Sequence, residues 1–413
     1  MRLLVIGGLL AMIPGACSTL EEETPRDAAV WTASDTANWS RIAHESLGGP
    51  GEQQMTAVTT FAGKLVAVGF EIVDGDRDGR AWVSEDGREW VKVTDPDLGG
   101  PGEQSVWAVT EAGPGLVAAG STGSSQDVDA AFWVSADGLD WIQVPSIASF
   151  QGRGIQSVAT VEVHDDQIYA GGADYTDAAL WTSPDGMSWS PVADPDFAGD
   201  GEQKLWRLQT TRHGLIAVGE NNRDAAVWIL DDTWTKIEDP VFGGDGHQLI
   251  RDVVEWDDML VAVGGAFTYE EIYFLGQGLG GNLDALVWTS RDGLVWNRVE
   301  DEDVPSGIGD QVMQAVVVWD DRLLGAGYDL AGRGNIEEGL APFGSGLDVD
   351  AAVWSSDNAT MWTRANSQAL GGDDWQDIWG VAVVPELGIV AVGGDDLGTD
   401  LEDSKSEGTG DSP

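Results

Sequence analysis

An acidic run near residue 75 is the first pattern in the sequence that could do chemistry. The run 74–79 reads DGDRDG, with carboxylates at alternate positions and glycine at two of the others. Oxygen ligands spaced in this way can wrap a hard cation such as Ca²⁺. The sequence therefore predicts either a small calcium site formed by Asp74, Asp76 and Asp78, or a solvated acidic turn with no metal.

Two long insertions, 267–281 and 328–349, interrupt an otherwise regular spacing in the second half of the chain. Both contain tyrosine, which gives flat apolar area with a polar tip and suits sugars and protein partners alike. Long loops on a rigid scaffold commonly carry function. The alternative is that the insertions only cap the fold or pack together. The candidate ligand-binding residues in them are Tyr269, Glu270, Tyr273, Tyr328 and Arg333.

Catalysis has little support in the sequence. The Gly-rich loops, such as GGPGEQ at 48–53, carry Glu and no Lys, so they are not phosphate cradles. Asp and Glu number 71, too many for spacing to single out one pair for glycoside hydrolysis. We assign no catalytic residue. The histidines are scattered without metal-ligand spacing, at His44, His164, His213 and His247.

A repeated unit must position any site that exists. A tryptophan followed eight residues later by a second one recurs six times, and a seventh copy has the shorter pair Trp228 and Trp234. Each pair encloses a turn such as SEDG at 84–87. Asp-Gly between two apolar runs is a strong hairpin signal, because glycine tolerates positive φ. We expect the turn aspartates to be structural, namely Asp86, Asp137, Asp185 and Asp292.

Each unit also carries a Gln at the end of a loop and an Asp four residues before the leading tryptophan. Because every unit has them, we expect hydrogen bonds to backbone amides that lock loops on one face, with a ligand-binding ring as the alternative. The glutamines are Gln53, Gln104, Gln156, Gln203, Gln248, Gln311 and Gln376. The aspartates are Asp27, Asp78, Asp129, Asp177, Asp224, Asp284 and Asp350.

The repeat predicts an all-β fold, a seven-bladed β-propeller of four-stranded blades. No stretch has a convincing helical period. The chain starts with an outer hairpin at 28–42 and ends with an inner hairpin at 378–393. Pairing of these N- and C-terminal segments would complete one blade and remove the exposed sheet edges. We therefore expect a single propeller domain over 27–393.

The turn Ser-x-Asp-Gly-x-x-Trp resembles the Asp-box, or BNR, motif of sialidase-like propellers. The resemblance extends from 27 to 394 through the repeats, although the turn lacks one residue that the family has between Asp and Gly. Asp-boxes stabilise the fold on the face opposite the active site, so the resemblance implies fold and not activity. Tyr269 with Glu270 could imitate the family's nucleophile pair, but its Phe/Tyr-Arg-Ile-Pro signature is absent.

The composition excludes several classes of partner. Asp and Glu outnumber the 21 Lys and Arg among 413 residues, which gives a net charge of -50. So acidic a chain repels phosphate backbones and anionic lipids, which excludes nucleic acid and a polybasic membrane patch. A single cysteine excludes an internal disulfide and a thiolate zinc cluster. We expect a monomer with no cofactor apart from the calcium considered above.

The first twenty residues predict export. Met1-Arg2 is a minimal charged start, 3–13 is a short apolar run, and small residues precede Cys17, the only cysteine. This resembles a bacterial lipoprotein signal, although Pro14 stands where an aliphatic residue is usual. We predict a signal peptide over 1–16, lipidation of Cys17, a tether over 17–26 and a disordered acidic tail over 394–413. Plain secretion and an uncleaved anchor are the alternatives.

These patterns together predict an extracytoplasmic binding or scaffold module, anchored to a bacterial membrane through lipid. Its partner would be a protein or a carbohydrate, held by the two insertions. The alternative function is a secreted glycoside hydrolase of sialidase-like architecture.

Overall fold

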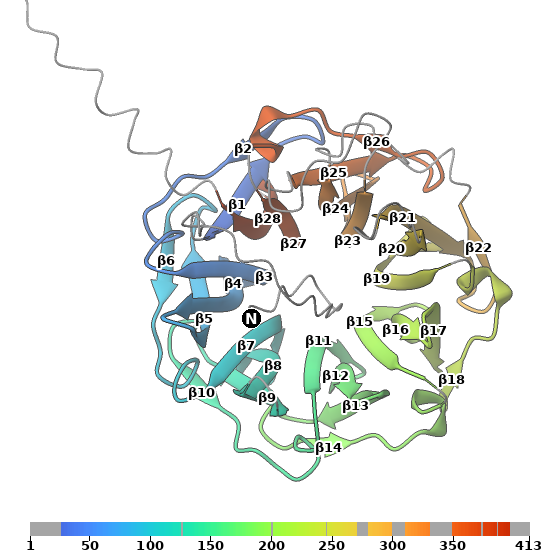
Figure 1. The fold of residues 1–413 in the computed structure, drawn as a ribbon, viewed down its shortest axis with the longest axis horizontal. Coiled ribbons are helices and arrows are strands. Elements are labelled where there is room, and N and C mark those ends of the chain that lie inside the picture. Colours follow the sequence, from blue (N-terminus) through green and yellow to red (C-terminus); the bar gives the residue numbers. More distant parts are fainter. Residues whose placement is uncertain are drawn as a thin grey trace, which may run out of the picture.

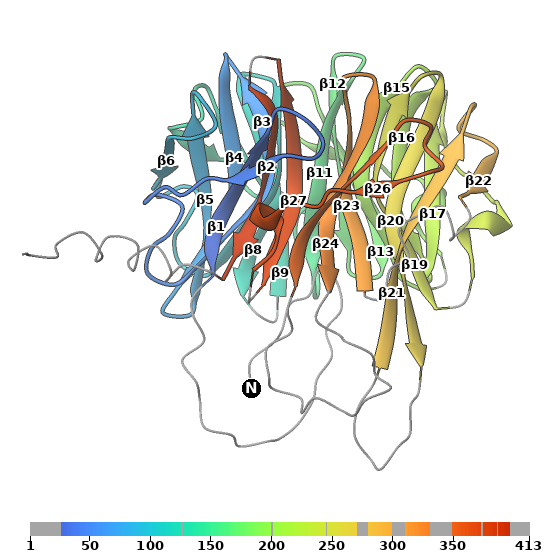
Figure 2. The ribbon, with the colours of Figure 1, turned by 90° about the horizontal axis from the view of Figure 1, so that it is seen from above.

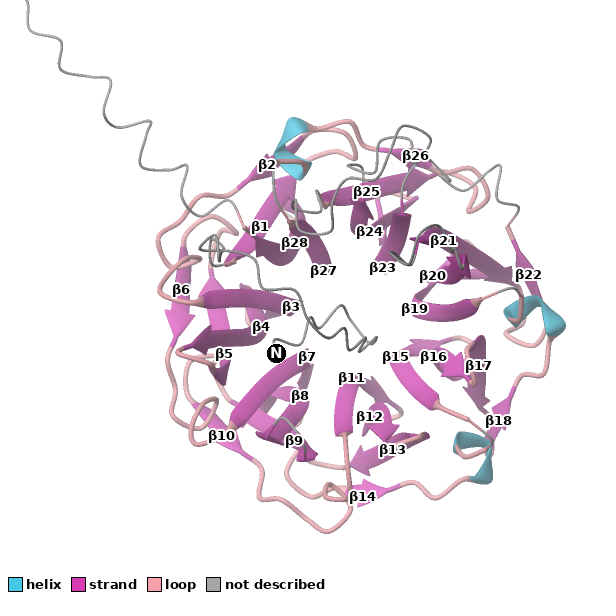
Figure 3. Cartoon of the chain, viewed as in Figure 1, coloured by secondary structure: helices cyan, strands magenta, loops and turns pink. Residues whose placement is uncertain are grey.

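Seven antiparallel sheets of four strands each surround a central axis in the computed structural model (Figure 1). The structure describes residues 26–124, 127–199, 201–244, 246–270, 280–299, 310–330, 349–372, 375–385 and 387–396. Each sheet is one blade, and it extends outward from one strand nearest the axis. In the described residues the only helices are short 3-10 turns at the periphery (Figure 3), η1 (Pro195–Phe197), η2 (Pro240–Phe242) and η4 (Gln368–Leu370). The predicted all-β, seven-bladed propeller is confirmed.

Six blades are built from consecutive strands. Blades two to four contain β3 (Glu52–Phe61), β4 (Lys64–Val73), β5 (Asp76–Ser84), β6 (Trp90–Val93), β7 (Glu103–Ala112), β8 (Gly115–Ser124), β9 (Asp127–Ser135), β10 (Trp141–Gln143), β11 (Gln156–His164), β12 (Gln167–Asp174), β13 (Asp177–Ser183) and β14 (Ser190–Pro191). Blades five to seven contain β15 (Gln203–Thr211), β16 (Gly214–Asn221), β17 (Asp224–Leu230), β18 (Trp234–Lys236), β19 (His247–Trp256), β20 (Met259–Glu270), β21 (Gly280–Ser290), β22 (Trp296–Arg298), β23 (Asp310–Trp319), β24 (Arg322–Leu330), β25 (Asp350–Ser356) and β26 (Thr363–Arg364).

Blade one joins the two ends of the chain, as the half-blades of the sequence predict. It has the order β2-β1-β28-β27, formed by β1 (Asp27–Ala33), β2 (Trp39–Arg41), β27 (Gln376–Val384) and β28 (Gly388–Asp395). Strands β1 and β28 pair without interruption from Asp27↔Asp395 to Ala33↔Ile389. The last strand therefore continues two residues past the predicted domain end at 393.

Arg26, the residue before β1, stabilises the pairing of the two ends of the chain in blade one. Its Nε donates to Asp396 at 3.0 Å, and its Nη1 donates to Gln54 Oε1 at 3.1 Å. Its guanidinium also lies 5.1 Å from the ring centroid of Trp375. One side chain thus contacts the residue after the last strand, the start of blade one and the neighbouring blade two.

The leading tryptophan of each unit joins neighbouring blades. All seven are at most 2% exposed. In blades one to six the indole Nε1 donates to a carbonyl of the preceding blade, in the loop that follows its outer strand. Trp82, for example, donates to Ser46 O at 3.2 Å, and Trp228 donates to Asp196 O at 2.7 Å. Blades one to six are therefore each both packed against and hydrogen-bonded to the preceding blade.

The Ser-x-Asp-Gly turn is held by its own side chains, as predicted for the structural aspartates. Asp86 Oδ1 accepts from the amides of Arg88 and Glu89, and Ser84 Oγ accepts from the amide of Gly87. These backbone hydrogen bonds lower the pKa of the Asp86 carboxyl. Gly87 has a φ of 71°, which disfavours a side chain there. Asp137, Asp185 and Asp292 accept the equivalent pairs of amides.

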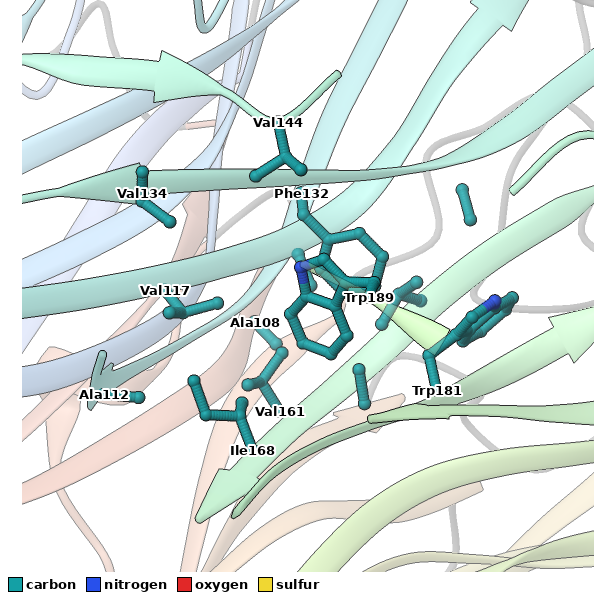
Figure 4. Close-up of a cluster of buried hydrophobic side chains, with 14 of the residues drawn as sticks. Ala108, Ala112, Val117, Phe132, Val134, Val144, Val161, Ile168, Trp181 and Trp189 are labelled. Atoms are coloured by element: carbon teal, nitrogen blue, oxygen red, sulfur yellow. The ribbon is translucent and has the colours of Figure 1, made fainter. Parts of the chain in front are cut away.

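The hydrophobic core lies between blades rather than in one central mass. Between blades three and four, the ring of Phe132 stacks on Trp189 with 4.0 Å between centroids and meets Trp181 edge-on (Figure 4). Val117 and Ile168 complete this layer from the two blades. None of the helices in the described part of the chain has the length and apolar character needed to cross a bilayer.

Candidate functional site

One end of the propeller carries the glutamines and aspartates that recur in every blade, and we call it the Gln face. The innermost and third strands of every blade start there, and Figure 2 shows it as the lower side. Gln53 Nε2 donates to Pro50 O at 3.3 Å, and Asp78 Oδ1 accepts from Gly100 N at 3.1 Å. The predicted loop locking is thus observed in part. Gln53, Gln104 and Gln156 donate to loop carbonyls rather than accepting from amides. Gln311 and Gln376 donate to the carboxylates of Asp329 and Asp395.

Both predicted insertions leave the propeller from the Gln face. Strands β20 and β21 stay paired to Glu270↔Gly280, four pairs beyond the Ala266↔Asp284 pair, so the first insertion prolongs this hairpin (Figure 2). The second insertion leaves between β24 and β25, after the pair Asp329↔Asp350. Of the candidate residues, Tyr273, Arg333 and Cys17 lie outside the described residues, and Tyr269 and Glu270 have a described backbone only.

Tyr328 is buried rather than presented to a ligand, which corrects its assignment as a loop residue. It lies within β24, opposite Val312, and is 6% exposed. Its ring packs with Val312, Val349 and Trp375. The strand runs three residues further than the sequence suggested, to Leu330, and Tyr328 belongs to the contact between blades seven and one.

The aspartates of the acidic run are not gathered in one place. Asp74 and Gly75 form the two-residue turn between β4 and β5, with φ values of 55° and 83°. Asp78 is already engaged, because its Oδ2 accepts from Arg80 at 2.9 Å while its Oδ1 holds a loop amide. Over the described ranges, no three His, Cys, Asp or Glu side chains form a group that could hold a metal ion. Asp74 therefore lies in the hairpin turn and Asp76 and Asp78 lie in β5, and calcium binding by these residues stays a prediction.

A β-bulge recurs in the innermost strand of every blade, three residues after the glutamine that recurs in each blade. In all seven blades the register with the second strand skips one residue at this point. A bulged residue leaves the regular ladder, and its side chain is re-aimed. From blade one to blade seven, the bulged residues are Trp379, Thr56, Trp107, Ala159, Trp206, Arg251 and Gln314.

The bulged residues belong to the innermost strand of each blade, beside the central channel that propeller blades enclose. The rings of Trp107 and Trp379 lie 6.4 Å apart, although blades three and one are not neighbours. Blade two contributes only Thr56 between them, which is 6% exposed and donates to Val68 O and Val106 O. Contact past an intervening blade can occur only beside the axis. At about 3.3 Å per residue, this level lies roughly 10 Å inside the Gln face.

One guanidinium and three aromatic rings form a continuous row that we call the first wall. In order, its side chains are Arg77, Phe70, Trp107 and Trp379. Phe70 meets Trp107 edge-on at 5.7 Å, and the Arg77 guanidinium lies 4.6 Å from the Phe70 centroid. Such contacts favour a cation over the ring face. The rings of Phe70, Trp107 and Trp379 are half-buried, so part of each is accessible from the channel.

Two hydrogen-bond donors of the first wall are unused. Arg77 Nε and Trp379 Nε1 are buried and have no hydrogen-bond partner in the described part of the chain. Burial lowers the pKa of the Arg77 guanidinium, and the nearby carboxylates of Glu103 and Glu52 oppose that shift. A buried donor without a partner costs about 1–3 kcal/mol, so this wall favours a ligand that brings acceptors.

The second wall consists of Trp206 and Arg251 from blades five and six. The Arg251 guanidinium lies 4.1 Å from the Trp206 centroid. Burial lowers the pKa of Arg251, and Tyr328 and Glu220 oppose this shift. Trp206 Nε1 is a further buried donor with no partner among the described residues. The two walls therefore share one chemistry, an aromatic ring beside a guanidinium and an unused donor.

The carboxylates deeper in the channel serve the contacts between blades. Asp252 is 5% exposed; its Oδ1 lies 3.1 Å from Arg207 Nε and accepts from Val253 N, and its Oδ2 accepts from Val316 N. Burial raises the pKa of this carboxyl, and Arg207 opposes the shift. Asp252 thus links blades five, six and seven, and its oxygens are already occupied.

Comparisons with known proteins find only distant similarities to solved structures. No protein-family model and no curated protein matches this chain, so the resemblance to Asp-box repeats stays a prediction. Sqt1 from Chaetomium thermophilum is 12% identical, with a TM-score of 0.47, and the match covers 83% of this chain and 80% of that one. An alpha-l-arabinofuranosidase from Fusarium graminearum is 9% identical, at a TM-score of 0.43 and coverages of 83% and 92%. A GH32 beta-fructofuranosidase from Bombyx mori is 13% identical, at a TM-score of 0.39 and coverages of 82% and 90%. With TM-scores below 0.5, none of these similarities bears on the activity of this chain.

Proposed function

We propose that this protein is a binding module for a neutral oligosaccharide, which it holds in the channel on the Gln face. The observation that supports this proposal is the first wall, where half-buried rings lie beside the unused donors of Arg77 and Trp379. This arrangement breaks the sevenfold symmetry, as a binding site on a repetitive scaffold must. The structural roles shared by all blades do not require it.

A sugar satisfies the chemistry of the first wall better than an apolar ligand does. The flat carbon face of a pyranose can lie against Trp107 or Trp379 and remove apolar area from water. Its hydroxyl oxygens can accept from Arg77 Nε and Trp379 Nε1, the donors that otherwise stay unsatisfied. The carboxylates of Glu52 and Glu103 near Arg77 can accept hydrogen bonds from the sugar hydroxyl groups. A neutral chain also avoids repulsion by the net charge of -50.

Replacing Trp107 tests the site directly. The wild-type protein is expected to bind a subset of neutral glycans on an array, and Trp107→Ala to lower the affinity for them about tenfold or more, because a stacking surface is lost. Trp319→Ala is the matched control, since Trp319 is a half-buried residue at the opposite end of an innermost strand. Isothermal titration with the best glycan gives the affinities.

Two outcomes would contradict the proposal: no neutral glycan binds, or Trp319→Ala weakens binding as much as Trp107→Ala does. Chromatography of the glycan after incubation is expected to show it intact. Cleavage that persists in purified protein would support the glycoside hydrolase alternative instead.

We also propose export and lipid anchoring, on the evidence of the first twenty residues alone. Strand β1 starts at Asp27 on the Gln face, so a lipid on Cys17 would hold the binding channel towards the membrane. Cys17→Ala is expected to move the protein from the detergent phase to the aqueous phase in Triton X-114 partitioning. Ser18→Ala is the control and should stay with the detergent. Equal partitioning of Cys17→Ala and wild type would refute the anchor.

A further inference from the structure

We infer that the ligand is an oligosaccharide long enough to contact both walls of the channel, and not a single sugar. This inference rests on the proposed function and adds to it the number and identity of the subsites. The first wall is the primary subsite, and Trp206 with Arg251 forms a second one.

Both walls lie at the same depth in the channel. Trp107, Trp379 and Trp206 occupy the same bulge position, three residues after the glutamine of blades three, one and five. The innermost strands all start at the Gln face, within one residue of the glutamine of their blade, so equivalent positions lie at similar depths. A ligand lying across the channel at this depth meets both walls.

Small residues separate the bulky ones around the channel. Thr56 lies between Trp379 and Trp107, and it is covered where their rings meet at 6.4 Å. Ala159 occupies the corresponding position between Trp107 and Trp206. In the described residues no ring contact joins Trp107 to Trp206, whereas Trp107 contacts Phe70 and Trp379. The two walls are therefore separate surfaces, and we infer that each contacts its own sugar unit.

The first wall offers the larger surface, which makes it the primary subsite. It has three rings, whereas one face of Trp206 lies against the Arg251 guanidinium at 4.1 Å. The buried Nε1 of Trp206 still needs an acceptor, which a second sugar unit supplies. Short glycans should therefore use the first wall alone, and longer ones should use both.

The test uses an array of neutral homo-oligosaccharides from monosaccharides to octasaccharides, followed by titration of the series that binds. Wild-type affinity is expected to rise with chain length and then to level off once both walls are occupied. Trp206→Ala should lower the affinity for the longest chain about tenfold and leave that of the disaccharide unchanged. Trp107→Ala should lower the affinity for every length, and Trp319→Ala should change none.

A second variant separates lost binding from lost folding. Trp206→Phe keeps an aromatic ring in the half-buried position and removes the pyrrole ring that carries Nε1, so its melting temperature should match that of wild type while long-chain affinity falls. Equal affinity of wild type and both Trp206 variants for the longest chain would overturn the second subsite. An equal loss for short and long chains would also overturn it. Absence of any Trp107-dependent binding would instead refute the proposed function itself.

Discussion

Deletion of residues 27–41 is expected to leave the protein unable to fold to a stable monomer. The segment supplies β1 and β2, half of blade one, and β1 pairs with β28 along its whole length. Without it, the edge of β28 and the facing side of blade two are exposed, and such edges template pairing between molecules. Size-exclusion chromatography with light scattering should show aggregates, and circular dichroism should show no cooperative melting.

Truncation of the other terminus provides the control. Residues 397–413 follow the last strand in the sequence, so their removal should leave the melting temperature unchanged. Removal from Gly394 onward should destabilise, because Asp395 is fully buried, pairs with Asp27 in the sheet and forms an ion pair with Arg41. If the variant lacking 27–41 purified as a soluble monomer with wild-type cooperativity, the N-terminal hairpin would not close the ring.

Trp288→Ala should cost about 3–5 kcal/mol of unfolding free energy, the range for truncating a large buried aromatic residue. Trp288 has no exposed surface, and its Nε1 donates to Val241 O at 3.2 Å across the contact between blades five and six. The substitution therefore opens a cavity and leaves the half-buried carbonyl of Val241 without this donor. Urea unfolding at constant temperature, followed by circular dichroism, measures the loss.

Val295→Ala is the matched control in the same outer hairpin. Val295 is 61% exposed, so its replacement should change the unfolding free energy by no more than about 0.5 kcal/mol. A loss below about 1 kcal/mol for Trp288→Ala would contradict the role assigned to the leading tryptophans.

The fold could be predicted because the same local signals recur in every blade. The Ser-x-Asp-Gly turn, the leading tryptophan and the loop glutamine each make contacts that a blade needs to fold. They therefore recur along the sequence, and the recurrence makes the pattern easy to recognise. Closure was predictable for a related reason, since the chain begins and ends with half of a unit. The strand end at Asp395 was harder to predict, because β28 continues through Gly393 and Gly394 into polar residues.

The candidate site could not be predicted from the repeat. Trp107, Trp206 and Trp379 share one offset from the blade glutamine, but the other four blades carry Thr, Ala, Arg and Gln there, so the position looks unpatterned. Only the bulge at this position, which pattern analysis does not detect, turns these side chains into the channel. Conversely, Tyr328 looked like a loop residue because its burial depends on the neighbouring blade.

A crystal structure with bound glycan would show directly whether the channel is the binding site. Crystals of the protein should be soaked with the longest neutral oligosaccharide that the array selects. We predict density inside the channel, with one sugar ring against Trp107 or Trp379, an oxygen within hydrogen-bond distance of Arg77 Nε, and the chain extending towards Trp206. Density on the outer rim or on the opposite face, with the channel empty, would contradict a binding site in the channel.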